Sequence, residues 1–155
     1  MQKKYERIKY ACFLTCTSTA ATGNMSPLLF LTFRKIYGIS FSLLGLLIVI
    51  NYGTHLLLDM IFSFFSHKFK LDYSVKMTPM VMTVGMLIYA AAPLLFPNNV
   101  YIGLVIGTVI FSAGSGLSEV LASPTVAAIP SKNPDRLMSR LHSCYAWGIV
   151  GVVCI

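Results

Sequence analysis

Four apolar segments of membrane-spanning length, followed by the start of a fifth, constrain the fold of this chain more than any other feature. A bilayer core about 30 Å thick is crossed by roughly 20 helical residues, and the first four segments reach that length. Backbone groups in lipid must be satisfied inside the segment, which favours the α-helix. The sequence therefore predicts an all-α, polytopic transmembrane helix bundle in one domain, with helices at about 10–33, 41–65, 77–96, 100–129 and 137–155.

The composition also indicates a membrane protein. Hydrophobic residues make up 56% of the chain and charged residues 11%, whereas about 25% of a soluble domain is charged. The net charge of +7 does not indicate nucleic-acid binding, because every Lys and Arg can be assigned to a loop or a tail. The four cysteines form no CxxC pair and have no nearby histidine pattern. They are therefore predicted to be packing residues, and neither a metal site nor a cofactor is expected.

Glu119 is a carboxylate inside the fourth apolar segment. A charged side chain near the centre of a bilayer costs about 2.5–3.5 kcal/mol, so Glu119 needs an interior, wetted or proton-sharing environment. Ser112, Gly116, Glu119 and Ser123 are spaced i, i+4, i+7 and i+11, which places them on one helical face. Pro124 is expected to bend or end the helix just beyond this face. Glu119 and Ser123 are therefore candidates for a binding or coupling site.

The first segment is unusually polar in its middle. A stripe of hydroxyl side chains falls on one helical face, formed by Thr15, Thr19 or Ser18, Thr22 and Ser26. Such a stripe is typical of a helix that lines a cavity, and equally of one that packs against neighbouring helices. In the cavity interpretation, Thr22, Asn24 and Ser26 would supply hydrogen-bonding groups to a solute.

Polar residues also recur in the second segment. Asn51, His55 and Asp59 are spaced four residues apart and therefore face the same way. His55 and Asp59 form an i, i+4 pair that is able to share a hydrogen bond. Two interpretations stay open: the pair belongs to a proton or solute path, or it locks helices together near the membrane surface.

The fifth segment begins with two further candidates, His142 and Trp147. Both would flank the cavity that contains Glu119, with Trp147 as a stacking surface. A tryptophan near a membrane interface is also common as a simple anchor.

Helix ends and packing sites are suggested by small residues and prolines. Pro93 and Pro97 are expected to end the third segment, and residues 66–73 are expected to form a tight basic turn. Gly103 and Gly107 form a small-xxx-small pair, which permits close helix approach.

The distribution of Lys and Arg predicts the orientation of the chain. By the positive-inside rule, the side with more Lys and Arg is cytoplasmic. The N-terminal tail, the second loop and the fourth loop are the basic ones, which predicts a cytoplasmic N-terminus in the cell membrane. Their cations are Lys3, Lys4, Arg7, Lys9, Lys68, Lys70, Lys76, Lys132, Arg136 and Arg140, against Arg34 and Lys35 in the first loop and none in the third.

Three parts of the sequence resemble the major facilitator superfamily of transporters, and in particular its fucose-permease-like sugar transporters. They are Glu119-Val120-Leu121-Ala122-Ser123-Pro124, the loop after the second segment, and the stretch Leu137-Met138-Ser139-Arg140-Leu141-His142-Ser143-Cys144-Tyr145-Ala146-Trp147-Gly148. The resemblance implies that the chain holds the first four helices, and the start of a fifth, of a twelve-helix major facilitator fold. It also implies a role in proton coupling or substrate binding for Glu119. The first segment lacks the acid of the fucose permease type.

These observations predict a secondary active transporter of a small polar solute, a sugar or a related metabolite, that is coupled to protons and works by alternating access. Ser26-Pro27 and Ser123-Pro124 support this prediction, because interrupted helices at corresponding repeat positions form substrate sites. The expected partners are the solute, protons, the lipid bilayer and the C-terminal half of the same transporter, and no nucleic acid.

The alternative is a truncated fragment or a helper subunit that needs a missing half, because the fifth segment is still incomplete where the sequence ends. A membrane enzyme is not expected, since the sequence contains no nucleophile motif and no metal-ligand spacing.

Overall fold

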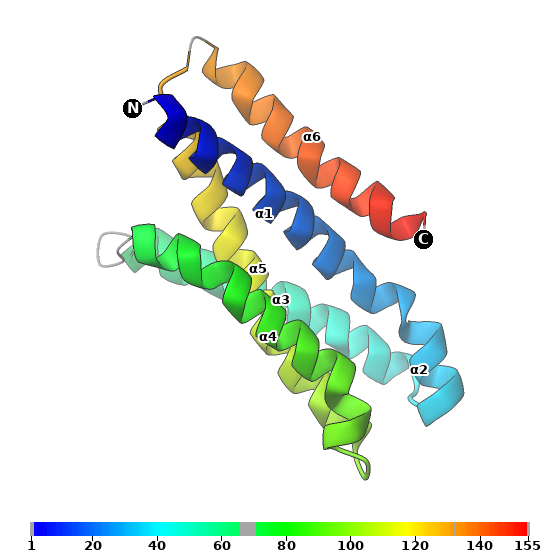
Figure 1. The fold of residues 1–155 in the computed structure, drawn as a ribbon. Coiled ribbons are helices and arrows are strands. Elements are labelled where there is room, and N and C mark those ends of the chain that lie inside the picture. Colours follow the sequence, from blue (N-terminus) through cyan, green and yellow to red (C-terminus); the bar gives the residue numbers. More distant parts are fainter. Residues whose placement is uncertain (1, 66–70, 132, 155) are drawn as a thin grey trace.

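In the computed structural model the chain is a bundle of α-helices (Figure 1). The structure describes the backbone of residues 2–65, 71–131 and 133–154, and the side chains of residues 5–64, 77–131 and 133–154. No strand occurs within these ranges, so the predicted all-α class is confirmed. The helices are α1 (Gln2–Leu28), α2 (Phe30–Tyr37), α3 (Phe41–Phe65), α4 (Leu71–Leu95), α5 (Val100–Ala127) and α6 (Pro134–Val153).

Three helices are long and apolar enough to cross a membrane, at Phe41–Phe64, Met77–Leu95 and Val100–Ala127. They correspond to the second, third and fourth predicted segments and indicate a membrane protein. The first and fifth predicted segments are also helical, as α1 and α6, but their described residues are not among the membrane-length apolar stretches. The reason is their polarity, since α1 combines a basic start with a run of hydroxyls and the first half of α6 is polar.

The helix α5 is at the centre of the bundle. It packs against α4, α3, α1 and α6, while α1 packs along α6. Figure 1 shows α1 and α6 lying side by side, and successive long helices running in opposite directions. The start of α1, the end of α5 and the start of α6 therefore lie at the same end of the bundle (Figure 1).

Glycines bring α4 and α5 into very close contact. A Cβ atom built on Gly107 would lie 2.7 Å from the Cα atom of Tyr89, and one built on Gly103 would lie 2.8 Å from the Cβ atom of Ala92. The predicted role of Gly103 and Gly107 in close helix packing is thus confirmed. Because lipid is as apolar as the protein interior, such close packing is a main source of helix association in a membrane.

A buried aromatic cluster joins α2, α4 and α5 next to this contact. The ring of Tyr89 packs edge-on against Phe33 and Phe111, with ring centroids 5.7 Å and 5.8 Å apart. The Tyr89 hydroxyl also forms a hydrogen bond of 2.7 Å with the hydroxyl of Ser26, which ties α1 to α4. Both residues are buried, so this bond satisfies two hydroxyls that would otherwise lack partners.

We expect Tyr89→Phe to lower the free energy of unfolding by about 1–3 kcal/mol, because it leaves the buried Ser26 hydroxyl without a partner. Adding Ser26→Ala should recover part of this loss, since both polar groups are then gone. Thermal unfolding of the four proteins of this double-mutant cycle in detergent measures the coupling. If the two single costs simply add, the hydroxyls do not interact as described.

Prolines lie close to the ends of three helices. Pro93 is inside α4, which ends at Leu95 between Pro93 and Pro97, and Pro124 is inside α5, which ends at Ala127. Both helices thus end within three residues of these prolines, close to the predicted limits of about 96 and 129. After Pro27 the helix breaks at Leu29, which divides the predicted segment 10–33 into α1 and α2.

Two helices begin earlier in the chain than the sequence predicted. The helix α1 begins at Gln2, so the basic tail continues the helix rather than preceding it. The helix α4 begins at Leu71, so residues 71–73 of the expected turn are helical, and residues 66–70 lie outside the described residues. Apolar periodicity marks the part of a helix that faces lipid, not its polar extension into water.

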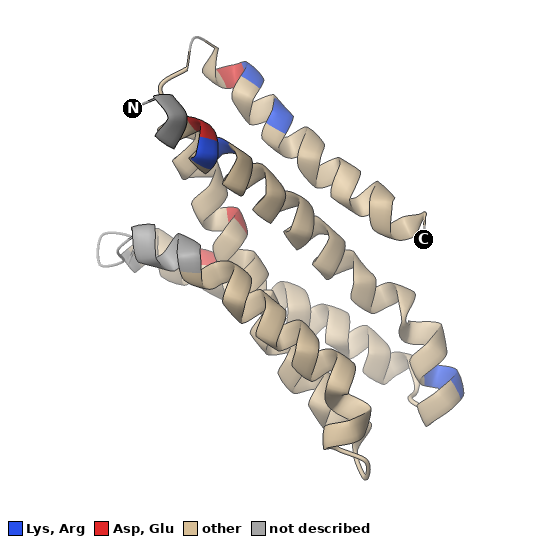
Figure 2. Ribbon diagram, viewed as in Figure 1, with Lys and Arg blue, Asp and Glu red and all other residues tan. Residues whose placement is uncertain are grey.

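The described cations lie at the two ends of the bundle. Figure 2 shows Lys and Arg at the start of α1 and the start of α6, which share one end, and on α2 at the opposite end. Two residues of the orientation argument, Arg34 and Lys35, belong to α2. The orientation was also predicted from Lys68, Lys70 and Lys132, which lie outside the described residues. The side chains of Lys3, Lys4 and Lys76 are not among the described ones either.

Candidate functional site

A polar cleft lies among α1, α3, α5 and α6. Its volume is about 280 Å³, close to the lower end of the range of about 300–1,000 Å³ for small-molecule pockets. None of its lining residues comes from the described part of α4, residues 77–95. The lining residues are Thr19, Gly23, Asn24, Asn51, Tyr52, His55, Leu56, Asp59, Glu119 and Tyr145.

Glu119 of α5 faces His55 of α3 within this cleft. Its Oε2 atom is 3.6 Å from His55 Nδ1, and the Nε2 atom of the same ring is 2.7 Å from the hydroxyl of Ser115. The Glu119 side chain keeps 38% of its surface exposed and that of His55 keeps 17%. The carboxylate therefore opens into the cleft while the imidazole is held between the helices.

Ser115 holds His55 in place between the two helices. Its hydroxyl forms a hydrogen bond of 2.7 Å with His55 Nε2 and lies 3.3 Å from the backbone carbonyl of Ser112. Because Nε2 is used in this bond, the other ring nitrogen, Nδ1, is the one that faces Glu119. Ser115 therefore orients the imidazole toward the carboxylate.

A second hydrogen bond joins the same two helices one turn away. The Ser112 hydroxyl donates to the Oδ1 atom of Asn51 over 2.9 Å. Polar residues recur along α3 and along the facing side of α5, so their two polar faces meet. The i, i+4 bond between His55 and Asp59 that the sequence allowed is not formed; His55 is bonded across the interface to Ser115, while Asp59 is exposed where it lines the cleft.

Two residues of α1 complete the polar wall. Thr19 is 2% exposed, and its hydroxyl has no hydrogen-bond partner in the protein. Asn24 donates from Nδ2 to the carbonyl of Ala20 over 2.8 Å, a bond that leaves its Oδ1 atom as an acceptor. A buried hydroxyl without a partner costs about 1–3 kcal/mol, which makes Thr19 a candidate ligand group.

Glu119 also borders a second pocket of about 330 Å³, lined by Cys16, Glu119, Ser123, Leu141, His142 and Tyr145. Glu119 and Tyr145 belong to both hollows. The structure therefore brings Ser123 and His142 close to Glu119 on one side, and Asn24, His55 and Asp59 on the other.

Three of the predicted site residues lie elsewhere. Ser26 is buried against Tyr89 between α1 and α4. Thr22 lines neither hollow, and its hydroxyl donates to the carbonyl of Ser18. Trp147 is 73% exposed and is absent from both linings, so it offers no stacking surface to this cleft. The hydroxyl stripe of α1 thus divides between the cleft and helix packing.

Three important residues were not predicted as site residues. Ser115 lies four residues before Glu119, so helical spacing alone was a signal for it. Tyr145 lies three residues after His142 on the same face of α6, and Tyr52 neighbours Asn51. Aromatic residues are so frequent in this chain that no sequence signal distinguishes these two.

The cleft has an excess of negative charge. Asp59 and Glu119 line it, and no Lys or Arg appears among its described lining residues. The described residues also contain no group of three or more His, Cys, Asp or Glu side chains close enough to hold a metal ion.

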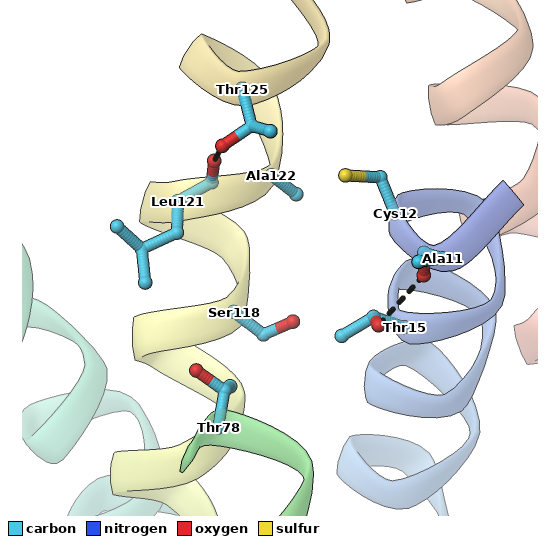
Figure 3. A pocket seen from close by; sticks show the side chains of 8 residues that line it. All are labelled: Ala11, Cys12, Thr15, Thr78, Ser118, Leu121, Ala122 and Thr125. Atoms are coloured by element: carbon cyan, nitrogen blue, oxygen red, sulfur yellow. Dashed lines mark hydrogen bonds between the residues drawn. The ribbon is translucent and has the colours of Figure 1, made fainter. Parts of the chain in front are cut away.

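A much smaller pocket separates α1 from α4 and α5 on another side of the bundle (Figure 3). Its volume is about 30 Å³, and a cavity of about 10–15 Å³ on the same measure already holds one water molecule. The buried hydroxyl of Ser118 lines it and has no hydrogen-bond partner in the protein. Figure 3 shows Thr15 and Thr78 on either side of Ser118. This pocket accommodates a solvent molecule rather than a solute.

The order Ser115, His55, Glu119 is also that of a hydrolase triad. Ser115 is completely buried and does not line the cleft, whereas a nucleophile has to contact its substrate. The arrangement therefore orients Glu119 rather than activating Ser115.

Comparisons of this chain with protein-family models, with curated proteins and with solved structures find no match. The resemblance to the major facilitator superfamily therefore stays a prediction.

Proposed function

We propose that this chain forms part of a secondary transporter that moves a small polar solute, a sugar or a related metabolite, across the cell membrane by alternating access. The observation that carries the proposal is the polar cleft, in which Glu119 and His55 meet hydroxyl and amide groups. These two residues come from α5 and α3, which are both long and apolar enough to cross a membrane. A carboxylate in this setting is costly unless it faces water, a proton donor or a solute.

In the proposed cycle Glu119 couples solute movement to protons. Its carboxylate is open to the cleft on one side and lies 3.6 Å from the Nδ1 atom of His55 on the other. Ionisable residues that face a cavity within a membrane commonly mark ion and substrate pathways. The resemblance of residues 119–124 to the fourth helix of major facilitator transporters supports the same role.

The proposed orientation has the N-terminus in the cytoplasm. The starts of α1 and α6 share one end of the bundle and contain Arg7, Lys9, Arg136 and Arg140, whereas α2 at the opposite end contains Arg34 and Lys35. A bias of this kind favours the more basic end as the cytoplasmic one.

Uptake measurements test the proposal. The longest reading frame that contains this chain is expressed and reconstituted in vesicles, and uptake of radiolabelled sugars, amines and organic acids is followed with and without a proton gradient. We expect at least one solute to accumulate above the level in empty vesicles, and its accumulation to be lost on addition of a protonophore. Folded protein that accumulates none of these solutes would contradict transport.

A second candidate is a helper subunit or partial transporter that needs a complementary set of helices. It is favoured by the 38% exposure of the Glu119 side chain, because in a bilayer this surface must be covered by water or by further protein. Uptake by the 155-residue chain alone is compared with uptake by the longest reading frame that contains it. Activity of the chain alone would exclude this candidate.

A further inference from the structure

We propose that the cleft selects a small organic ammonium ion over a neutral sugar. This inference rests on the proposed function: it keeps the transport of a small polar solute, but names an organic cation rather than a sugar as the solute that binds beside Glu119. Charge, aromatic surface and one buried hydroxyl support it independently of one another.

The first observation is an uncompensated negative charge. Glu119 and Asp59 both line the cleft, and its described lining residues include no Lys or Arg. His55 lies 3.6 Å from Glu119, and even a protonated ring would balance only one of the two acids. A solute with a positive charge would therefore be attracted into the cleft, whereas a neutral polyol would leave at least one carboxylate without a counter-ion.

The second observation is the position of the aromatic rings. Tyr52 and Tyr145 both line the cleft, and the centroid of the Tyr52 ring is 6.5 Å from that of His55, whose Nδ1 atom is 3.6 Å from Glu119. The side chain of Tyr145 interacts directly with that of Glu119, so an ammonium group held beside the carboxylate has this tyrosine next to it. Cations bind over such rings within about 6 Å of the centroid, and quaternary ammonium ligands are recognised in this way.

The third observation is the buried hydroxyl of Thr19. This side chain lines the cleft, is 2% exposed and has no partner in the protein. Asn24 adds an amide oxygen from the same helix. A solute with a hydroxyl or a protonated amine satisfies these groups, and the cleft volume of about 280 Å³ fits a molecule of few heavy atoms. A bare metal ion fits less well, since the described residues hold no metal-binding cluster.

Binding of choline and of putrescine to the purified full chain in nanodiscs tests the inference. Each ammonium ion is compared with an uncharged analogue of the same size: the alcohol in which a quaternary carbon replaces the nitrogen of choline, and butanediol for putrescine. We expect at least one ammonium ion to bind at least about tenfold more tightly than its analogue. Its affinity should fall as salt is raised, because screening weakens attraction between exposed charges.

Three variants locate the binding. Glu119→Gln and Asp59→Asn should each weaken ammonium binding about tenfold or more and leave binding of the uncharged analogue unchanged, which also shows that the cleft is still folded. Asp135→Asn is the matched control, because Asp135 is an acid in the first turn of α6 and lines neither hollow. This control should bind ammonium like the unchanged protein.

The outcomes separate the inference from the proposed function. Equal binding of the charged and uncharged compounds would overturn the inference. Displacement of the ammonium ion by Na⁺, at a concentration too low to screen charge, would also overturn it. Uptake of a neutral sugar without ammonium binding would also overturn it and leave transport standing. Ammonium binding without uptake by the longest reading frame would support the site and contradict transport.

Discussion

Gly85→Ala is expected to destabilise the bundle more than any other single-methyl change in the described helices. Gly85 of α4 faces the backbone of α5, and a Cβ atom added to it would lie 2.6 Å from the Cα atom of Phe111. Real Cβ atoms do not approach a backbone this closely, and the obstacle cannot rotate away as a side chain would. Overpacking costs about 1–3 kcal/mol where side chains are able to adjust, so we expect at least the upper end of that range here.

Gly53→Ala is the matched control for this prediction. Gly53 lies on α3, and a Cβ atom added to it would have nothing within 4 Å. Alanine there should stabilise the helix by up to about 1 kcal/mol through its higher helix propensity. The two variants are compared by thermal unfolding, followed by circular dichroism. They are also compared by the fraction of protein that elutes as a non-aggregated peak in size-exclusion chromatography in detergent. If both are equally stable, α4 and α5 do not approach each other as the structure indicates.

Glu119→Gln is expected to abolish proton-driven accumulation of the transported solute, with a loss of about tenfold or more in the rate of uptake under a proton gradient. Glutamine has nearly the same shape and still forms hydrogen bonds, but it neither takes up nor releases a proton near neutral pH. Coupling should therefore be lost while the protein stays folded. The measurement is uptake by proteoliposomes that contain equal amounts of the variant and the unchanged protein.

The control for this second prediction is again Asp135→Asn, which removes a carboxylate outside both hollows. Exchange of solute across vesicles without any gradient gives a further comparison, because it needs binding and conformational change but no net proton movement. Glu119→Gln should keep more of this exchange than of gradient-driven accumulation. Undiminished accumulation by the variant would remove Glu119 from the coupling role.

Local sequence was a good guide to the helices and a poorer one to their ends. Length and hydropathy correctly located the stretches of α3, α4 and α5 that are apolar enough to span a membrane. The helices α4 and α5 end within three residues of Pro93 and Pro124, whereas α1 begins at Gln2, well before the predicted start at about 10. The polar extension of a helix carries no apolar periodicity, which is why this start was not predicted.

The candidate site was predictable only in part, because local sequence does not show what a polar residue faces. Glu119, His55 and Asn24 were recognised as polar residues in an apolar setting, and the structure places them in one cleft. Ser26 showed the same pattern but is bonded to Tyr89 at a helix contact. Periodicity identifies the face on which a residue lies, but it does not tell whether that face meets a cavity or another helix.

The sequence by itself determined that the chain folds into helices of membrane-spanning length and that a carboxylate lies within one of them, because a backbone in an apolar setting must satisfy its own hydrogen bonds whatever surrounds it. Only the tertiary structure decided that Glu119 faces His55, that Ser115 orients the ring, and that Tyr145 borders the same cleft. These pairings depend on how each helix is rotated and how closely it approaches its neighbour. The glycine contacts between α4 and α5, together with the contacts of α5 with α1, α3 and α6, set both quantities.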